Sequence, residues 1–352
     1  MIGNLFKSKS SARKTKIICT IGPATSKDAV LKRMVNEGMD FARFNFSHGK
    51  LEEFQKWARS IRKFARRAKR KVEIIQDLQG PRVRVGHLSH EGRHIVAGHH
   101  VTLIFDENQD LNRGEIPIQN DVELKLKKGD KILMDRGLVE LEVRRVEGPR
   151  VVCRALTSGI IFSGKGVNLP DTEAKAAFTN KDLEDLKNGL EMDVEWVALS
   201  FVENADDVLG LKKHIGDRAK IISKIERPQA IHNYYEILEV SDAVMIARGD
   251  LGIEIPFWKL PVIQKRAIRR ARNAGKPSIV ATDMLESMTV SERPTRAEIL
   301  DVANAVIDRA SAVMLSDETA IGKYPVEALV AMRKIVEEAE AFIHTHELKS
   351  LL

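Results

Sequence analysis

The sequence is poor in cysteine and aromatic residues, and it contains no long apolar run. Two cysteines, Cys19 and Cys153, occur among 352 residues, and each lies in an apolar stretch. They provide neither a disulfide framework nor a cysteine-rich metal site, so we expect a reducing compartment. No apolar run approaches the ~18 residues that span a bilayer. These absences exclude disulfide-stabilised secreted proteins and predict that the chain does not cross a membrane.

The first residues also lack the features of a secretory signal. Residues 1–16 carry basic side chains but no useful length of apolar sequence. A secretory signal needs an apolar region of ~7–15 residues after its charged start. We therefore expect a cytoplasmic protein.

The chain does contain enough apolar sequence for a sizeable core. Hydrophobic residues make up 43% of it, charged residues 30%, and the formal net charge is +7. A chain of this length favours one large domain, or a large domain with a small one. The moderate positive charge favours anionic ligands in general.

Much of that positive charge is concentrated in residues 57–72, which have helical periodicity. Trp57, Ile61, Phe64 and Ala68 fall on one face of such a helix, and the stretch contains no acidic residue. Its basic face could bind RNA, a membrane surface or a protein. It could equally be the solvated face of an outer helix. Because no aromatic residue is interleaved on the basic face, we favour the second interpretation and do not expect nucleic-acid binding.

Short β-prone runs alternate with helical segments along most of the chain. The predicted strands are residues 16–21, 41–44, 72–76, 196–199, 221–223, 243–247, 278–281 and 312–315. They are apolar throughout, as buried parallel strands are, and each is followed by a helix. Eight strand–helix units favour a closed (β/α)8 barrel of the α/β class over an open, doubly wound sheet.

The alternation is interrupted between the third and fourth of these strands. Residues 86–164 show short β-prone pieces split by turns, and residues 139–143 alternate apolar and polar side chains as a half-exposed antiparallel strand does. This stretch reads as an inserted β-barrel-like domain. The barrel then consists of residues 1–85 and 165–352.

Charged residues follow two neighbouring predicted strands. Lys224 and Glu226 end one, and Arg248 and Asp250 end the next. Two carboxylates beside an ammonium group suit a hard divalent cation and a phosphorylated substrate. Structural salt bridges would use the same residues, so these four alone leave both interpretations open.

The barrel prediction offers an internal test, because the loops after its strands gather on one face and hold the active site. Polar residues do follow most predicted strands, whereas the opposite loops look like ordinary turns. The residues that follow the strands are Arg43, Asn45, Ser47, His48, Asp77, Arg82, Arg84, Lys224, Glu226, Arg248, Asp250, Thr282, Asp283, Glu286, Ser316, Asp317 and Glu318. Because these polar residues are expected on one rim of the barrel, we favour an active site over structural salt bridges.

At these positions the sequence resembles pyruvate kinases. The motifs that carry the resemblance are Thr15–Ala24, Arg43–Gly49, Asp77–Pro81, Lys165–Pro170, Ile222–Glu226, Ala247–Gly252, Ala281–Met288, Pro294–Glu298 and Met314–Ala320. Some are weak individually, but their order over residues 15 to about 335 is specific. The resemblance implies phosphoryl transfer from phosphoenolpyruvate to ADP, which gives pyruvate and ATP in glycolysis. It also implies that the inserted domain is a lid that excludes water.

The resemblance assigns roles at the barrel rim. Glu226 and Asp250 would bind Mg²⁺ or Mn²⁺, and Lys224 would neutralise charge on the phosphoryl group. Thr282 would contact the substrate carboxylate or relay a proton. The remaining assignments are substrate contacts by Arg43 and Gly249, and nucleotide contacts by Asn45, His48, Arg84 and Lys165.

A monovalent-cation site is implied less clearly. Many family members hold K⁺ with residues matching Asn45, Ser47, Asp77 and a threonine that is Leu78 here. Position 82 is Arg, where K⁺-dependent members have Glu. A guanidinium group there can supply the positive charge, so we predict activity without K⁺. Asp283, Asp317 and Arg136 also depart from the family's usual residues.

The sequence stops where typical members continue into a further domain that carries a sugar-phosphate site and an oligomer interface. From this the resemblance predicts no such allosteric activation, and a monomer or barrel-to-barrel homodimer. Two other functions stay open. One is a different Mg²⁺-dependent barrel enzyme acting on an enolpyruvate or 2-oxo acid, and the other is a non-catalytic relative that binds RNA or protein through residues 57–72.

Overall fold

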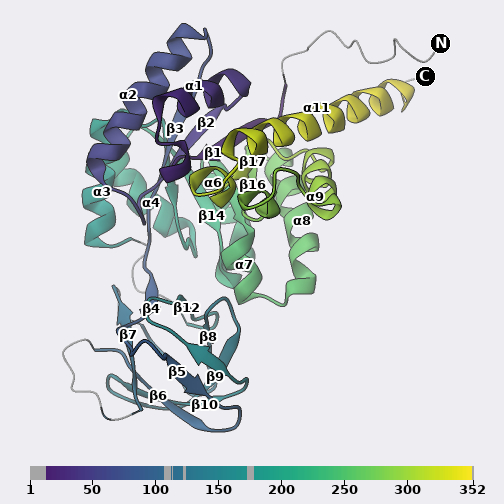
Figure 1. Ribbon diagram of the computed structural model, residues 1–352. Helices are drawn as coiled ribbons and strands as arrows, with labels where there is room; N and C mark the ends of the chain where they lie inside the picture. Colours follow the sequence, from purple (N-terminus) through teal and green to yellow (C-terminus); the bar gives the residue numbers. More distant parts are fainter. Residues whose placement is uncertain (1–12, 107–111, 113, 122–123, 173–177, 351–352) are drawn as a thin grey trace. The chain divides into compact units, whose positions relative to one another are not determined.

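A computed structural model describes residues 13–106, 112, 114–121, 124–172 and 178–350, with side chains described to residue 345. Figure 1 shows the chain coloured along its sequence. Among the described helices, none combines the length and apolarity that crossing a membrane requires.

The parallel strands close into a barrel, which confirms the predicted α/β class and (β/α)8 architecture. In order around the barrel they are β1, β17, β16, β15, β14, β13, β3 and β2. Their bounds are β1 Lys16–Thr20, β2 Phe41–Asn45, β3 Glu73–Asp77, β13 Trp196–Leu199, β14 Lys220–Ile225, β15 Ala243–Ala247, β16 Ser278–Ala281 and β17 Ala312–Leu315. Nearly every residue in them is buried, as expected of apolar parallel strands covered on both faces. Closure occurs where Ile18 of β1 pairs with Met314 of β17 and with Phe41 of β2.

Each barrel strand is followed along the chain by at least one helix. The helices are α1 Asp28–Glu37, α2 Leu51–Arg67, α3 Asn180–Glu191, α4 Ala205–Ile215, α5 Pro228–His232, α6 Tyr234–Val240, α7 Arg248–Glu254, α8 Leu260–Asn273, α9 Arg296–Ile307, α10 Asp317–Ala320 and α11 Pro325–Ser350. Short 3₁₀ turns lie at η1 Pro23–Thr25, η2 Phe257–Lys259 and η3 Glu286–Thr289.

Helix ends in the barrel sequence follow local capping chemistry. Thr179 caps α3, since its hydroxyl accepts the Asp182 N–H while the Asp182 carboxylate accepts the Thr179 N–H. Gly38 ends α1 with a left-handed φ of 117°, which glycine adopts without strain. Ser26 is not the N-cap of α1. The N-cap of α1 is Lys27, and Ser26 Oγ instead donates to the Pro23 carbonyl at 2.9 Å.

The basic helix α2 packs by its apolar face. Trp57, Ile61 and Phe64 are buried, and the Phe54 ring stacks on Phe44 with ring centroids 5.4 Å apart. The helix begins before residue 57 and ends before residue 72. It ends early because Lys69 adopts a left-handed φ of 53°, which a continuing helix cannot contain.

The residues between β3 and α3 form two antiparallel-rich sheets, which we call the β module. Its strands are β4 Val83–Val85, β5 Arg93–Ile95, β6 His100–Ile104, β7 Ile116–Asn120, β8 Lys131–Met134, β9 Val139–Glu147, β10 Arg150–Ala155, β11 Gly159–Ile161 and β12 Val167–Asn168. Seven of them form one sheet, and β5 pairs with β11 in another. Within residues 139–143 of β9, buried and half-buried side chains alternate, as predicted.

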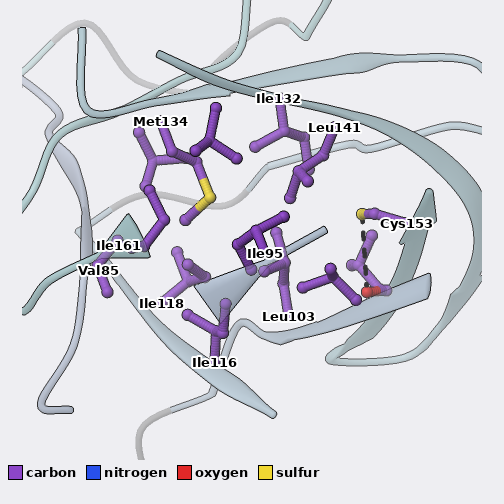
Figure 2. Packing of buried hydrophobic residues seen from close by; sticks show 14 of the residues in the cluster. Val85, Ile95, Leu103, Ile116, Ile118, Ile132, Met134, Leu141, Cys153 and Ile161 are labelled. Carbon is purple, nitrogen blue, oxygen red and sulfur yellow. Dashed lines mark hydrogen bonds between the residues drawn. The ribbon is translucent and has the colours of Figure 1, made fainter. Parts of the chain in front are cut away.

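The β module has an apolar core of its own. Figure 2 shows Ile95, Leu103 and Leu141 directed into the same interior, and each is at most 3% exposed. Cys153 lies in this core and Cys19 in β1, and both are buried free thiols, as the sequence predicted.

By the density of its contacts the chain divides into two compact units. The first contains residues 1–75, 194–196 and 265–352, and the second contains residues 76–193 and 197–264. The β module belongs entirely to the second unit. The predicted domain limits, 1–85 with 165–352 and 86–164, stay a prediction.

Candidate active site

Lys224 and Glu226 lie at the carboxyl end of β14, within the second unit. Lys224 is 7% exposed, and its ammonium group contacts three oxygen atoms. Its Nζ lies 2.9 Å from Glu226 Oε1, 3.2 Å from Asp77 Oδ1 and 2.8 Å from Ser200 Oγ. These contacts compensate the loss of water around a buried charge.

The Glu226 carboxylate is buried and incompletely neutralised. Its Oε2 accepts the Phe201 N–H at 2.7 Å, whereas Oε1 has no hydrogen bond of suitable geometry within the described structure. Burial raises the pKa of Glu226 to about 7, the Lys224 charge opposes that rise, and the Asp250 charge adds to it. Glu226 is therefore paired with one ammonium group and at the same time repelled by the Asp250 carboxylate.

This arrangement fits a divalent cation. An unsatisfied buried oxygen on Glu226, facing the field of Asp250, is the kind of donor that Mg²⁺ or Mn²⁺ binds. The described residues contain no cluster of three or more His, Cys, Asp or Glu that could enclose a metal. Two carboxylates leave coordination positions for water and substrate, as Mg²⁺ sites commonly do.

Asp250 and Gly249 lie in the first turn of α7, which starts directly after β15. Both are partly exposed. Arg248 is the first residue of the same helix.

Asp77 and Leu78, two members of the implied K⁺ set, lie at the end of β3 beside Lys224. Asp77 is 1% exposed and pairs with the Lys224 ammonium group. Leu78 is fully buried, and its carbonyl accepts the Ser200 hydroxyl at 2.7 Å. Ser200 thus links the ends of β3 and β14, a role that the sequence analysis missed.

In the first unit, Arg43 lies at the end of β2 and is 9% exposed. Its Nη1 donates to Thr20 Oγ1 at 3.0 Å, and the Thr20 hydroxyl donates to the Leu315 carbonyl at 2.9 Å. Thr319 Oγ1 donates to the Thr20 carbonyl at 2.8 Å. The guanidinium group is therefore held from β1, which in turn is fixed to β17 and α10.

Thr282 and Asp283 follow β16 in an unusual backbone conformation. Their φ angles are 70° and 54°, a left-handed region that non-glycine residues rarely occupy and that is costly for a β-branched residue. The next part of this loop is held by Glu318, whose carboxylate accepts the Leu285 N–H at 2.9 Å and the Ser316 N–H at 2.7 Å. Burial raises the pKa of Glu318.

Asn45, Ser47 and His48 come together in one turn after β2. The Ser47 N–H donates to Asn45 Oδ1 at 3.1 Å, and the His48 N–H donates to the Asn45 carbonyl at the same distance. The His48 side chain is exposed. The Asn45 side chain thus closes its own turn, as asparagine commonly does.

Arg84 and Lys165 lie side by side where the β module adjoins the barrel sequence. The Val85 N–H donates to the Lys165 carbonyl at 2.9 Å, and Arg84 forms a β-bridge with Gly166. Lys165 Nζ lies 2.9 Å from Asp135 Oδ1. Burial and the nearby Arg82 charge lower the pKa of Arg84, so this region of the second unit concentrates positive charge.

Comparisons with known proteins all point in one direction. Residues 12–329 match the model of the family described as pyruvate kinase, barrel domain. A pyruvate kinase from Thermococcus litoralis is 43% identical over 338 residues, which cover 94% of this chain and 70% of that one. One from Agrobacterium vitis is 42% identical over 94% of this chain and 69% of its own. The crystal structure of a pyruvate kinase from Cryptosporidium parvum superposes with a TM-score of 0.88 at 38% identity, covering 94% of this chain and 70% of that one.

Proposed function

The chain belongs to the pyruvate kinase family, and we propose that it transfers the phosphoryl group of phosphoenolpyruvate to ADP, giving pyruvate and ATP. The observation that carries this proposal is the buried group of Lys224, Glu226 and Asp77 at the end of β14. It combines a fixed ammonium group with a buried carboxylate that is repelled by the neighbouring charge of Asp250. Both features suit a reaction in which a highly charged phosphoryl group moves between two oxygen atoms.

Glu226 and Asp250 would hold the divalent cation of this reaction, Mg²⁺ or Mn²⁺. Bound there, the cation supplies charge neutralisation and orients substrate oxygens. The chain's own contribution is to present two carboxylates from neighbouring strand ends. Lys224 and the Phe201 N–H fix Glu226 in place before substrate arrives.

Lys224 would neutralise charge on the phosphoryl group during transfer. Its ammonium group is held by Asp77, Ser200 and Glu226, so it needs little reorganisation when the transition state forms. The role requires a fixed point charge and no proton transfer.

The other residues would have the roles that the family resemblance assigns to them. Thr282 and the N–H groups of Gly249 and Asp250 would contact the carboxylate of the substrate, with Thr282 also able to relay a proton to the enolate. Arg43 would contact the transferred phosphate. Asn45, His48, Arg84 and Lys165 would contact the nucleotide. The β module would act as a lid that keeps water from competing for the phosphoryl group.

The decisive experiment is a coupled assay with phosphoenolpyruvate, ADP and Mg²⁺, run on the wild type and on Lys224→Met. We expect kcat of the variant to fall by about 10²–10³-fold, the usual loss when one preorganised donor to a transition state is removed. Lys187→Met, on the exposed face of α3, is the matched control and should retain wild-type kcat. Substrate binding without turnover in the wild type would favour a different Mg²⁺-dependent barrel enzyme. Salt-sensitive RNA binding without activity would favour a non-catalytic relative that binds through α2.

We also propose that the enzyme does not require K⁺. Asp77, one of the residues that would hold K⁺, is already paired with the Lys224 ammonium group, and Leu78 offers no side-chain oxygen. Arg82 brings a further positive charge close to Arg84. Activity in buffer that contains tetramethylammonium in place of K⁺ should equal activity in K⁺. A stimulation of tenfold or more by K⁺ would contradict this.

A further inference from the structure

Arg227 is a buried cation next to the candidate metal ligand Glu226, and none of the roles above uses it. It lies between β14 and α5, and its side chain is 7% exposed. A charged group is buried this deeply only when its hydrogen bonds are satisfied, so its partners indicate what it holds together.

The Arg227 guanidinium group reaches several chain segments at once. Its Nη2 donates to the carbonyls of Leu169 and Thr172, each at 2.7 Å. Its Nη1 pairs with the Glu203 carboxylate, and its Nε lies 3.3 Å from Glu254 Oε2. Leu169 and Thr172 belong to the segment that follows β12, where the chain leaves the β module.

Glu254 gives this network its connection to the active site. It is the last residue of α7, the seven-residue helix whose first turn carries Gly249 and Asp250. Its other carboxylate oxygen, Oε1, accepts Asn168 Nδ2 at 3.1 Å, and Asn168 is the last residue of β12. The C-terminal end of α7 is therefore bonded both to Asn168 of β12 and to Arg227, which follows Glu226 directly in the sequence.

The shape of the guanidinium group matters to this arrangement. It is planar and presents its N–H donors in a fixed fork, so that one side chain can bond two carbonyls and two carboxylates in different directions. A lysine side chain carries the same charge on a single nitrogen atom. It therefore cannot bond all of the carbonyls and carboxylates that Arg227 contacts. Arg227→Lys thus removes the fork while keeping the charge.

We propose that Arg227 is a positioning residue, which sets the place of α7, and with it Asp250, relative to Glu226 and to the segment Asn168–Thr172. The two metal-binding carboxylates come from different strand ends, so their separation depends on how α7 is anchored. Through the same contacts, the point where the β module rejoins the barrel sequence is tied to the metal site. This inference rests on the proposed metal and substrate roles of Asp250 and Glu226.

The test measures Mn²⁺ binding directly, by electron paramagnetic resonance of the free ion, without substrate. Arg227→Lys should raise the Kd for Mn²⁺ by about tenfold or more, the usual effect of removing a residue that orients metal ligands. Arg333→Lys is the matched control, because Arg333 also bonds two carboxylates, those of Glu37 and Glu337, but within the first unit. That variant should bind Mn²⁺ as the wild type does.

A second variant covers the case in which Arg227→Lys does not fold. Asn168→Ala removes the side-chain bond from Asn168 to Glu254 and leaves the Arg227 contacts in place. It should also raise the Kd for Mn²⁺, by about threefold. This change is smaller than the one expected for Arg227→Lys, because part of the anchoring of α7 remains. Wild-type Mn²⁺ affinity in the variants that fold would overturn the proposal, as would a wild type that does not bind Mn²⁺. A wild type that binds Mn²⁺ but does not turn over phosphoenolpyruvate would refute the proposed function, and the Mn²⁺ Kd values would still decide the role of Arg227.

Discussion

Glu318 is a buried residue whose protonation should be visible in stability. It is fully buried, and its carboxylate bonds two backbone N–H groups, those of Leu285 and Ser316. Burial nevertheless raises its pKa. The folded state thus binds this proton more tightly than the unfolded state, where the pKa is about 4.3. The stabilisation is complete below that pH and is lost as pH rises through the folded-state pKa.

Glu318→Gln, which does not titrate, isolates this effect. The free energy of unfolding of the wild type, relative to that of the variant, should decrease as pH is raised from about 4 to 8. Urea unfolding at a series of pH values measures the difference. Glu338→Gln, at an exposed position on α11, is the control and should leave the free energy of unfolding close to that of the wild type. A pH-independent difference for Glu318→Gln would contradict the raised pKa.

At the scale of single residues, the sequence indicated which charged side chains follow a strand, but it did not indicate which backbone N–H groups bond them. Lys224 and Glu226 were predicted because charged residues at the end of an apolar strand are visible in the sequence. Ser200 and Phe201 were missed, although a serine directly after the strand at residues 196–199 was a signal that could have been used. The Phe201 N–H that bonds Glu226 has no sequence signature, since it depends on a left-handed φ of 55°.

At the scale of elements, α3 and α4 offer a matched pair of glycines. Gly189 of α3 faces the buried side chain of Gln76 on β3, and a methyl group at Gly189 would collide with the Gln76 amide. Gly210 of α4 has room, because a methyl group there would meet the Phe178 ring at 3.4 Å, an ordinary van der Waals distance.

The two substitutions by alanine should therefore have opposite effects. Gly189→Ala should destabilise the protein by about 1–3 kcal/mol through overpacking. Gly210→Ala should stabilise it by up to about 1 kcal/mol, because alanine loses less backbone entropy than glycine in a helix. Thermal unfolding followed by circular dichroism compares them. A higher Tm for Gly189→Ala than for the wild type would show that Gln76 can move aside.

Elements were easier to predict than their ends. The strands were identified by their continuous apolar runs, and their bounds differ from the prediction by a few residues at most, as with β14, which extends to Ile225. Ends that depend on the path of the backbone were less predictable. Serine is a common helix N-cap, yet the N-cap of α1 is Lys27 and not Ser26, because the Ser26 hydroxyl bonds within the preceding turn. Nothing in the residue types alone distinguishes these two outcomes.

At the scale of the whole molecule, the independence of the β module can be tested. Its core is made of its own residues, such as Ile95, Leu103 and Leu141, and its sheets contain strands from Val83 to Asn168 only. An isolated chain of residues 83–168 should therefore fold, with a β-type circular dichroism spectrum and a cooperative thermal transition. A random-coil spectrum would contradict this and would show that the module depends on the barrel.

The closure of the barrel has a consequence for how the protein is made. Thr20 of β1 bonds the carbonyl of Leu315, which lies 295 residues away along the chain. During synthesis at ~5–20 residues per second, β1 must wait roughly 15–60 s before its partner β17 leaves the ribosome. For that time one edge of β1 has no strand to pair with, and exposed strand edges promote aggregation. The nascent chain therefore needs protection longest at its first strand, which makes β1 the segment where a chaperone would matter most.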